Sequence, residues 1–140
     1  MHHLFIATLL VIFFLCSISV AAEGVKIEPG EWEMTSTTSS ATLDQDHVQT
    51  TSRCIKFSEL TANDLTPKRG ECSISENSVT GNTLNWKVAC KMQVGTMNGV
   101  GSFSSKGTAG SGNMDLDMHV QNDKFKVQVT WEARRLGDCK

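Results

Sequence analysis

The sequence predicts an all-β fold: an antiparallel meander of about six to eight strands that forms a small barrel, such as a lipocalin-like barrel, or a sandwich. Two observations predict it. Apolar and polar residues alternate along several segments, which is typical of half-buried strands. Turns that contain Gly and Asn separate those segments. One short helix and two disulfides complete the expected fold.

The first 22 of the 140 residues differ from the rest, because none is charged and 17 are apolar. They end in the small residues Ser19, Ala21 and Ala22, of the kind that a signal peptidase accepts beside its cleavage site. We therefore expect residues 1–22 to be a cleaved signal peptide and residues 23–140 to be one β domain in the periplasm. The alternative is an uncleaved segment that contacts the membrane, since the apolar run is just long enough to cross a bilayer.

Length and charge limit what the remaining 118 residues can be. They suffice for one domain but not for two. The formal net charge of the chain is −2 and no run of Lys or Arg occurs, which argues against a nucleic-acid partner. Leu, Ile, Val and Phe are scarce, so the expected core is thin and relies on Trp, Met and the disulfides.

Four cysteines follow the leader: Cys54, Cys72, Cys90 and Cys139. An even number in an exported chain predicts two disulfides, and four cysteines allow three pairings. No Cys-x-x-Cys motif occurs, so the sequence supports neither a thioredoxin-type redox site nor a zinc knuckle.

Hydrophobic periodicity selects one of these pairings. Apolar residues alternate with polar ones over 72–75 and 84–90, on both sides of a turn around Gly81. Folding the chain about this turn gives three pairs: Ile74 with Val88, Ser78 with Leu84, and Cys72 with Cys90. The register therefore predicts a Cys72–Cys90 disulfide across two strands, which leaves Cys54 to pair with Cys139.

A second hairpin is predicted in the last third of the chain. Apolar residues occupy alternate positions over 114–120 and 125–133. With Asn122-Asp123 as a two-residue turn, the apolar pairs are Val120 with Phe125, Met118 with Val127, Leu116 with Val129, and Met114 with Trp131. The opposite face is expected to be solvated, with the pairs His119 and Lys126, Asp117 and Gln128, and Asp115 and Thr130.

Further strands are expected at 31–37, 48–54 and 96–104. The second of these is rich in Thr and Ser, as in an edge strand, and Gly99 and Gly101 in the third indicate bulges or a close approach of the backbone. The one expected helix has Ser58 as its N-cap, continues over residues 59–62 and ends before Pro67.

Several motifs resemble those of one bacterial family. They are the Pro29-Gly30-Glu31-Trp32-Glu33 opening, the Gly81-Asn82-x-x-x-Trp86-x-x-x-Cys90 run, the stretch Thr-Met-Asn-Gly-Val-Gly at 96–101, and the closing Arg134-Arg135-Leu136-Gly137-Asp138-Cys139. Their order, together with the four cysteines, resembles the domain-of-unknown-function family numbered 3617 across nearly all of residues 23–140. The resemblance implies a small periplasmic protein of Gram-negative bacteria and implies no activity. The Ser- and Thr-rich tract 35–42 departs from the Met- and Pro-containing loops that family members often carry there.

Metal and cofactor sites have little support. Asp115, Asp117 and His119 share one strand face, but neighbours lie about 6.6 Å apart, so one cation is not easily reached by all three. The thioethers of Met114 and Met118 are soft ligands that suit Cu(I), yet methionines at strand spacing on an apolar face are typical of a core. We expect no metal and no cofactor, with His119, Met114 and Met118 as the weak candidates.

No catalytic constellation is recognisable either. No Ser lies in a Gly-x-Ser-x-Gly motif and no acid–base set stands out, so we expect a protein that is not an enzyme. Arg134 and Arg135 could bind an anion through bidentate hydrogen bonds. Neighbours on a strand point to opposite faces, so we expect instead that one of them forms a salt bridge near Asp138.

Two functions stand as hypotheses. The first is a binding module, a small β-barrel that holds an apolar or amphipathic small molecule, with Trp32, Trp86 and Trp131 as candidates to line its site. The second is a structural or protein-interaction module of the bacterial envelope that binds a partner protein through a sheet edge. The observation that separates them is whether the three Trp side chains fill the interior or line a void.

Overall fold

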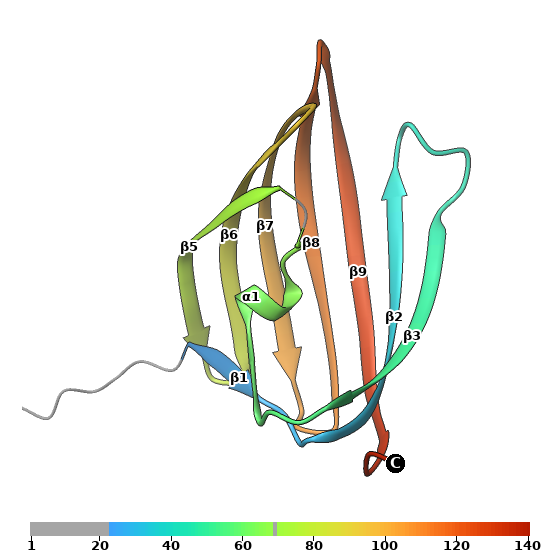
Figure 1. Ribbon diagram of the computed structural model, residues 1–140, viewed down its shortest axis with the longest axis vertical. Coiled ribbons are helices and arrows are strands. Elements are labelled where there is room, and N and C mark those ends of the chain that lie inside the picture. Colours follow the sequence, from blue (N-terminus) through green and yellow to red (C-terminus); the bar gives the residue numbers. More distant parts are fainter. Residues whose placement is uncertain (1–22, 69) are drawn as a thin grey trace, which may run out of the picture.

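The computed structural model describes residues 23–68 and 70–140, so the predicted signal peptide lies outside the described residues. Seven strands form one antiparallel sheet in the order β3-β2-β9-β8-β7-β6-β5 (Figure 1). Their bounds are β2 Gly30–Ser40, β3 His47–Ile55, β5 Glu71–Thr80, β6 Thr83–Met92, β7 Gly95–Ser105, β8 Ala109–Val120 and β9 Asp123–Gly137. Two shorter strands, β1 (Gly24–Lys26) and β4 (Glu59–Thr61), pair with each other, and a short helix, α1, spans Ala62–Leu65.

The seven-stranded sheet is open, and its two faces differ. β3 and β5 are its edges and do not pair with each other, so the all-β fold is sandwich-like and the sheet does not close into a barrel. α1 and the β1–β4 ribbon pack against one face, over β5, β6 and β7, and the sheet curves around them (Figure 1). We call this the concave face; it carries the core and the side chains of Trp32, Trp86 and Trp131. The other is the outer face.

The first predicted hairpin is confirmed near its disulfide and corrected near its turn. β5 and β6 keep two predicted pairs, Cys72 with Cys90 and Ile74 with Val88. A bulge between Ser75 and Ser78 then shifts the register by one residue, so Val79, and not Ser78, lies opposite Leu84. The shift has a packing reason, because it brings an apolar side chain to the concave face, where Val79 packs against the core.

The second hairpin has the predicted faces but a different register. Its two-residue turn is Gln121-Asn122, with Gln121 at a φ of 55°, so the predicted turn at Asn122-Asp123 is wrong. The concave-face pairs are Met118 with Phe125, Leu116 with Val127, Met114 with Val129, and Gly112 with Trp131. The glycine opposite Trp131 makes room for the neighbouring Phe103, because a Cβ atom at Gly112 would lie 2.8 Å from that ring. The shift is two residues long, so every side chain stays on its predicted face.

The helix begins later than predicted. Residues Glu59–Thr61 form strand β4, and Thr61 rather than Ser58 is the N-cap of α1. Asp64 accepts hydrogen bonds from the backbone N–H (2.9 Å) and the hydroxyl (2.7 Å) of Thr61, which is how an acidic residue in the first turn stabilises a helix start. The predicted end before Pro67 is confirmed.

Glycines on β7 and β8 make room for aromatic rings in the core. Trp86 of β6 and Phe103 of β7 are almost fully buried. A Cβ atom at Gly101 would lie 2.3 Å from the Trp86 indole, and one at Gly110 would lie 2.5 Å from the Phe103 ring. The pairing of β7 with both neighbours runs without a register shift. Of the two roles predicted for Gly99 and Gly101, the close approach is therefore confirmed and the bulge is not.

Both disulfides have the predicted pairing. Cys72–Cys90 joins β5 to β6, and Cys54–Cys139 joins the end of β3 to the C-terminal residues across 85 positions of the sequence. The second bridge therefore holds an edge strand and the end of the chain together. Stable disulfides are typical of proteins that fold in an oxidising compartment.

Candidate functional site

A cavity of about 220 Å³ lies on the concave face, between β2, β3 and β9 on one side and β4 and α1 on the other. Its walls are apolar and buried. All five elements contribute side chains to them: Trp32, Ile55, Leu60, Leu65, Trp131 and Ala133. Its rim is polar and exposed, and consists of Thr51, Arg53 and Asp64. The local sequence explains this division: Thr51, Arg53 and Ile55 alternate along β3 and so share one face.

The three Trp side chains are placed differently around this cavity. Trp32 lines it, and its indole N–H donates a hydrogen bond to the carbonyl of Glu28 at 2.8 Å, which fixes the ring. Trp131 also lines it and stacks on Trp86, with ring centroids 6.3 Å apart. Trp86 is not part of the lining: it is packed against Gly101, and its indole N–H has no hydrogen-bond partner among the described residues. Two indoles therefore border the void and the third fills the core behind them.

The volume of the cavity limits what it can hold. An engineered apolar cavity of about 150 Å³ binds benzene, whereas pockets for drug-sized ligands measure about 300–1,000 Å³. A volume of about 220 Å³ lies between these values. The cavity can therefore take one small apolar group, such as an aromatic ring or a short alkyl chain, but not a whole lipid.

The two charged residues of the rim differ in their contacts. The Asp64 carboxylate is engaged with Thr61 at the start of α1, as described above. The Arg53 guanidinium forms no hydrogen bond or ion pair with any residue that the structure describes. The rim thus presents one engaged carboxylate and one guanidinium whose donors face solvent.

Alternation separates the neighbouring arginines near the end of β9, as predicted. Arg134 lies on the outer face and pairs with Glu33 at 2.8 Å. Arg135 lies on the concave face, where it pairs with Asp138 and donates to the carbonyl of Pro29 at 2.8 Å. The predicted salt bridge near Asp138 is confirmed, and the two arginines do not form one anion site.

The outer face of β8 and β9 is solvated, as predicted, but with other partners. Lys126 pairs with Asp117 at 2.7 Å and Gln128 donates to Asp115 at 3.0 Å, because the register is shifted by two residues. His119 lies opposite Lys124. The hydrogen bond to Asp117 and the charge of its carboxylate raise the pKa of Lys126 above its usual value.

The structure does not bring the weak metal candidates together. Met114 and Met118 lie on the concave face of β8, where Met114 is buried in the core. His119 lies on the outer face of the same strand and is exposed. The sheet itself therefore separates the imidazole from the two thioethers.

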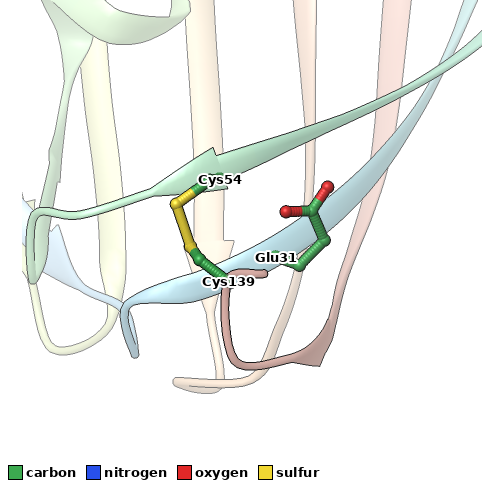
Figure 2. Close-up of side chains that lie close together, drawn as sticks. All are labelled: Glu31, Cys54 and Cys139. Carbon is green, nitrogen blue, oxygen red and sulfur yellow. A yellow bond between two sulfur atoms is a disulfide. The ribbon is translucent and has the colours of Figure 1, made fainter.

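One other cluster of ligand-type atoms occurs near the C-terminus (Figure 2). Atoms of Glu31, Cys54 and Cys139 lie within 4.8 Å of one another. The two sulfurs are bonded to each other, so neither is the thiolate that a metal ion requires. The cluster is therefore a disulfide beside a carboxylate.

Sequence reasoning selected only Trp32 and Trp131 among the twelve residues that line the cavity; Arg53, Ile55, Leu60 and Leu65 are among the ten that it missed. The spacing of Ile55 from Arg53 and Thr51 was a usable signal, because it places an apolar residue and a cation on one face of β3. Leu60 and Leu65 reach the cavity only through the packing of β4 and α1 on the large sheet, for which no local pattern exists.

Comparison with known proteins defines the family of the chain. Among the described residues, no helix combines the length and the apolar character needed to cross a membrane. Neither curated proteins nor solved structures gave a significant match. The model of the family described as Protein of unknown function (DUF3617) matches residues 27–139, which include all seven strands of the large sheet and both disulfides. The resemblance seen in the sequence is confirmed: the chain belongs to the DUF3617 family of proteins of unknown function.

Proposed function

We propose that this protein is a non-enzymatic binding module of the periplasm, whose cavity takes one apolar group of a small molecule. The observation that carries the proposal is the cavity between Trp32 and Trp131. Protein interiors are normally packed to a density of about 0.75, so an apolar-walled void of this size is space available to a ligand. The two disulfides and the signal-like leader support a periplasmic location.

The composition of the rim supports binding rather than catalysis. Its polar side chains are Thr51, Arg53 and Asp64, and the Asp64 carboxylate is engaged with Thr61. Thr51 is the hydroxyl residue of the lining, and its hydroxyl forms no hydrogen bond to a general base among the described residues, as an activated nucleophile requires. The arrangement therefore favours a site that holds a molecule and leaves it unchanged.

A series of straight-chain alcohols from butanol to decanol tests this function. Each buried methylene contributes about 0.8 kcal/mol, so the affinity should rise about fourfold per carbon until the cavity is full and then level off. The fluorescence and the indole N–H resonances of Trp32 and Trp131 report binding, because both rings border the cavity.

Two variants of the same chain provide the controls. Ala133→Leu places extra methyl groups in the cavity and should abolish the binding of all the alcohols. Val100→Leu makes a similar change on the exposed outer face and should leave binding as in the wild type. Alcohols that do not bind, or that bind equally well to Ala133→Leu, would contradict the proposed function.

The outer edge of β3 favours a second candidate function, a structural or protein-interaction module of the envelope. β3 is an edge strand with eight exposed residues of nine, it pairs regularly with β2, and it contains neither Lys nor Pro. Natural sheets usually protect such edges with charges, Pro or bulges; β3 has Arg53 as its one charge at neutral pH and neither Pro nor a bulge, and such an edge can accept a strand from a partner.

Photo-crosslinking in cells tests the edge directly. A photoreactive residue at Val48 should give an adduct with one defined protein, and Thr50→Lys with Ser52→Lys on the outer face should remove it. These two positions do not line the cavity, so alcohol binding should be unchanged. An adduct that persists in the double variant would contradict a role for this edge.

A further inference from the structure

We propose that the ligand is an amphipathic anion, whose apolar group enters the cavity and whose carboxylate or phosphate head group binds Arg53 at the rim. The inference rests on the proposed function and adds the chemical class of the ligand. It depends on three features of the rim: the position of Arg53 beside the apolar wall, the absence of a described partner for its guanidinium, and the Asp64 carboxylate on the other side of the cavity.

The pairing of β2 with β3 places Arg53 beside the apolar wall. Arg53 lies directly opposite Trp32, and both side chains line the cavity. Ile55, two residues along β3, is buried in the same lining. A ligand whose apolar part lies against Trp32 and Ile55 thus has its polar end next to a guanidinium.

Arg53 differs from the other described arginines in having no partner. Arg134 pairs with Glu33 and Arg135 pairs with Asp138, whereas no described residue accepts a hydrogen bond from Arg53. A guanidinium carries five N–H donors in a planar fork that matches two oxygens of a carboxylate or phosphate. Arg53 is therefore able to bind an oxyanion without first breaking a contact within the protein.

The opposing charge at the rim explains why the head group should be an anion and not a cation. Asp64 is the acidic residue of the lining, and one of its oxygens already accepts two hydrogen bonds from Thr61. A cationic head group would have only the second oxygen of this carboxylate to bind, while an anionic one would have the five N–H donors of Arg53. Repulsion from Asp64 places the anion on the β3 side of the rim.

Three probes with the same eight-carbon chain test the inference: octanoate, octanol and octylamine. Wild-type protein should bind octanoate about fivefold more tightly than octanol, the strength of a well-oriented exposed ion pair, and octylamine least tightly. Added salt should reduce this preference for octanoate and leave octanol binding unchanged. Arg53→Gln should bind octanoate no more tightly than octanol, because Asp64 remains at the rim, while Lys106→Gln, which removes the same charge away from the cavity, should behave as wild type.

The outcomes separate the two proposals. Equal binding of octanoate and octanol, unchanged in Arg53→Gln, would overturn the role of Arg53 and leave the binding module standing. A preference for octylamine would assign the head group to Asp64 and overturn the inference in the same way. If none of the three probes binds, the proposed function fails and this inference fails with it.

Discussion

The two halves of the concave face use aromatic side chains in opposite ways. On β6 and β7, Trp86 and Phe103 occupy the space above glycines of the neighbouring strands, so this half is filled, with Phe103 at its border with the cavity. On β2, β3 and β9, Trp32 and Trp131 border a void, and β3 contributes to it both the buried Ile55 and, opposite Trp32, the exposed Arg53. The comparison teaches that Trp side chains on one face of a sheet can either fill the core or border a cavity, according to what packs over them: here Leu60 and Leu65 of β4 and α1 border the void with Trp32 and Trp131.

The largest effect should come from the two disulfides, of which one lies in each half. In the chain-entropy model, removing Cys54–Cys139, which spans 85 residues, should lower the free energy of unfolding by about 4.5 kcal/mol. Removing Cys72–Cys90, which spans 18 residues, should lower it by about 3 kcal/mol. Urea denaturation of the two Cys→Ser double variants measures both values.

The same variants should differ in binding. Without Cys54–Cys139, the end of β3 loses its link to the C-terminus. The cavity between β2, β3 and β9 should therefore lose its affinity for alcohols. Without Cys72–Cys90, binding should persist. A larger loss of stability without Cys72–Cys90 would contradict the chain-entropy model, and a loss of binding in that variant would show that the two halves do not respond independently.

A smaller effect is expected from Gly101→Ala in the filled half. The new Cβ would lie 2.3 Å from the Trp86 indole, and such overpacking costs about 1–3 kcal/mol. Asn98→Ala, on the exposed outer face of the same strand, should stay within about 0.5 kcal/mol of wild type. Urea denaturation gives the free energies, and near-ultraviolet circular dichroism should report the loss of the Trp86–Trp131 stack. Equal stability of the two variants would mean that the ring moves freely.

The smallest effect should come from Lys126→Met on the outer face, behind both halves. Its ion pair with Asp117 is exposed, so we expect only a small loss of stability at neutral pH and no change in binding. Asp117 raises the pKa of Lys126, so the stabilisation is present below the usual value of 10.5 and is lost as the pH rises through the raised pKa. Urea midpoints of both proteins from pH 7 to 11 test this. A difference between them that disappears below pH 9 would contradict it.

Alternation in the sequence predicts faces well and register less well. Met114, Leu116 and Met118 lie on the predicted face, although their partners on β9 are two residues away from the predicted ones. A two-residue shift leaves all faces unchanged, so the apolar pattern cannot detect it. The register with Gln121-Asn122 as the turn places Gly112 opposite Trp131 and leaves room there for the ring of Phe103, a long-range contact that the alternation does not report.

The candidate site was predictable only in part. The alternation around Trp32 and Trp131 places both rings on inward faces, and both line the cavity. The cavity itself depends on β4 and α1, whose Leu60 and Leu65 come from a segment where the sequence indicated a helix with a different start. Contacts between segments far apart in the chain leave no periodic signal, so the site could not be assembled from local patterns.

The position of β2 in the sheet has a consequence for the order of folding. β2 lies between β3 and β9, and it pairs along its length with the last strand of the chain. The strands β5 to β9 form a meander of local hairpins, whereas the β2–β3 hairpin can join it only when β9 is present. Because long-range pairing is slow, we expect the meander to form first and the hairpin to dock last. If such a chain crosses a membrane N-terminus first, the sheet cannot be completed until β9, the last strand, has emerged.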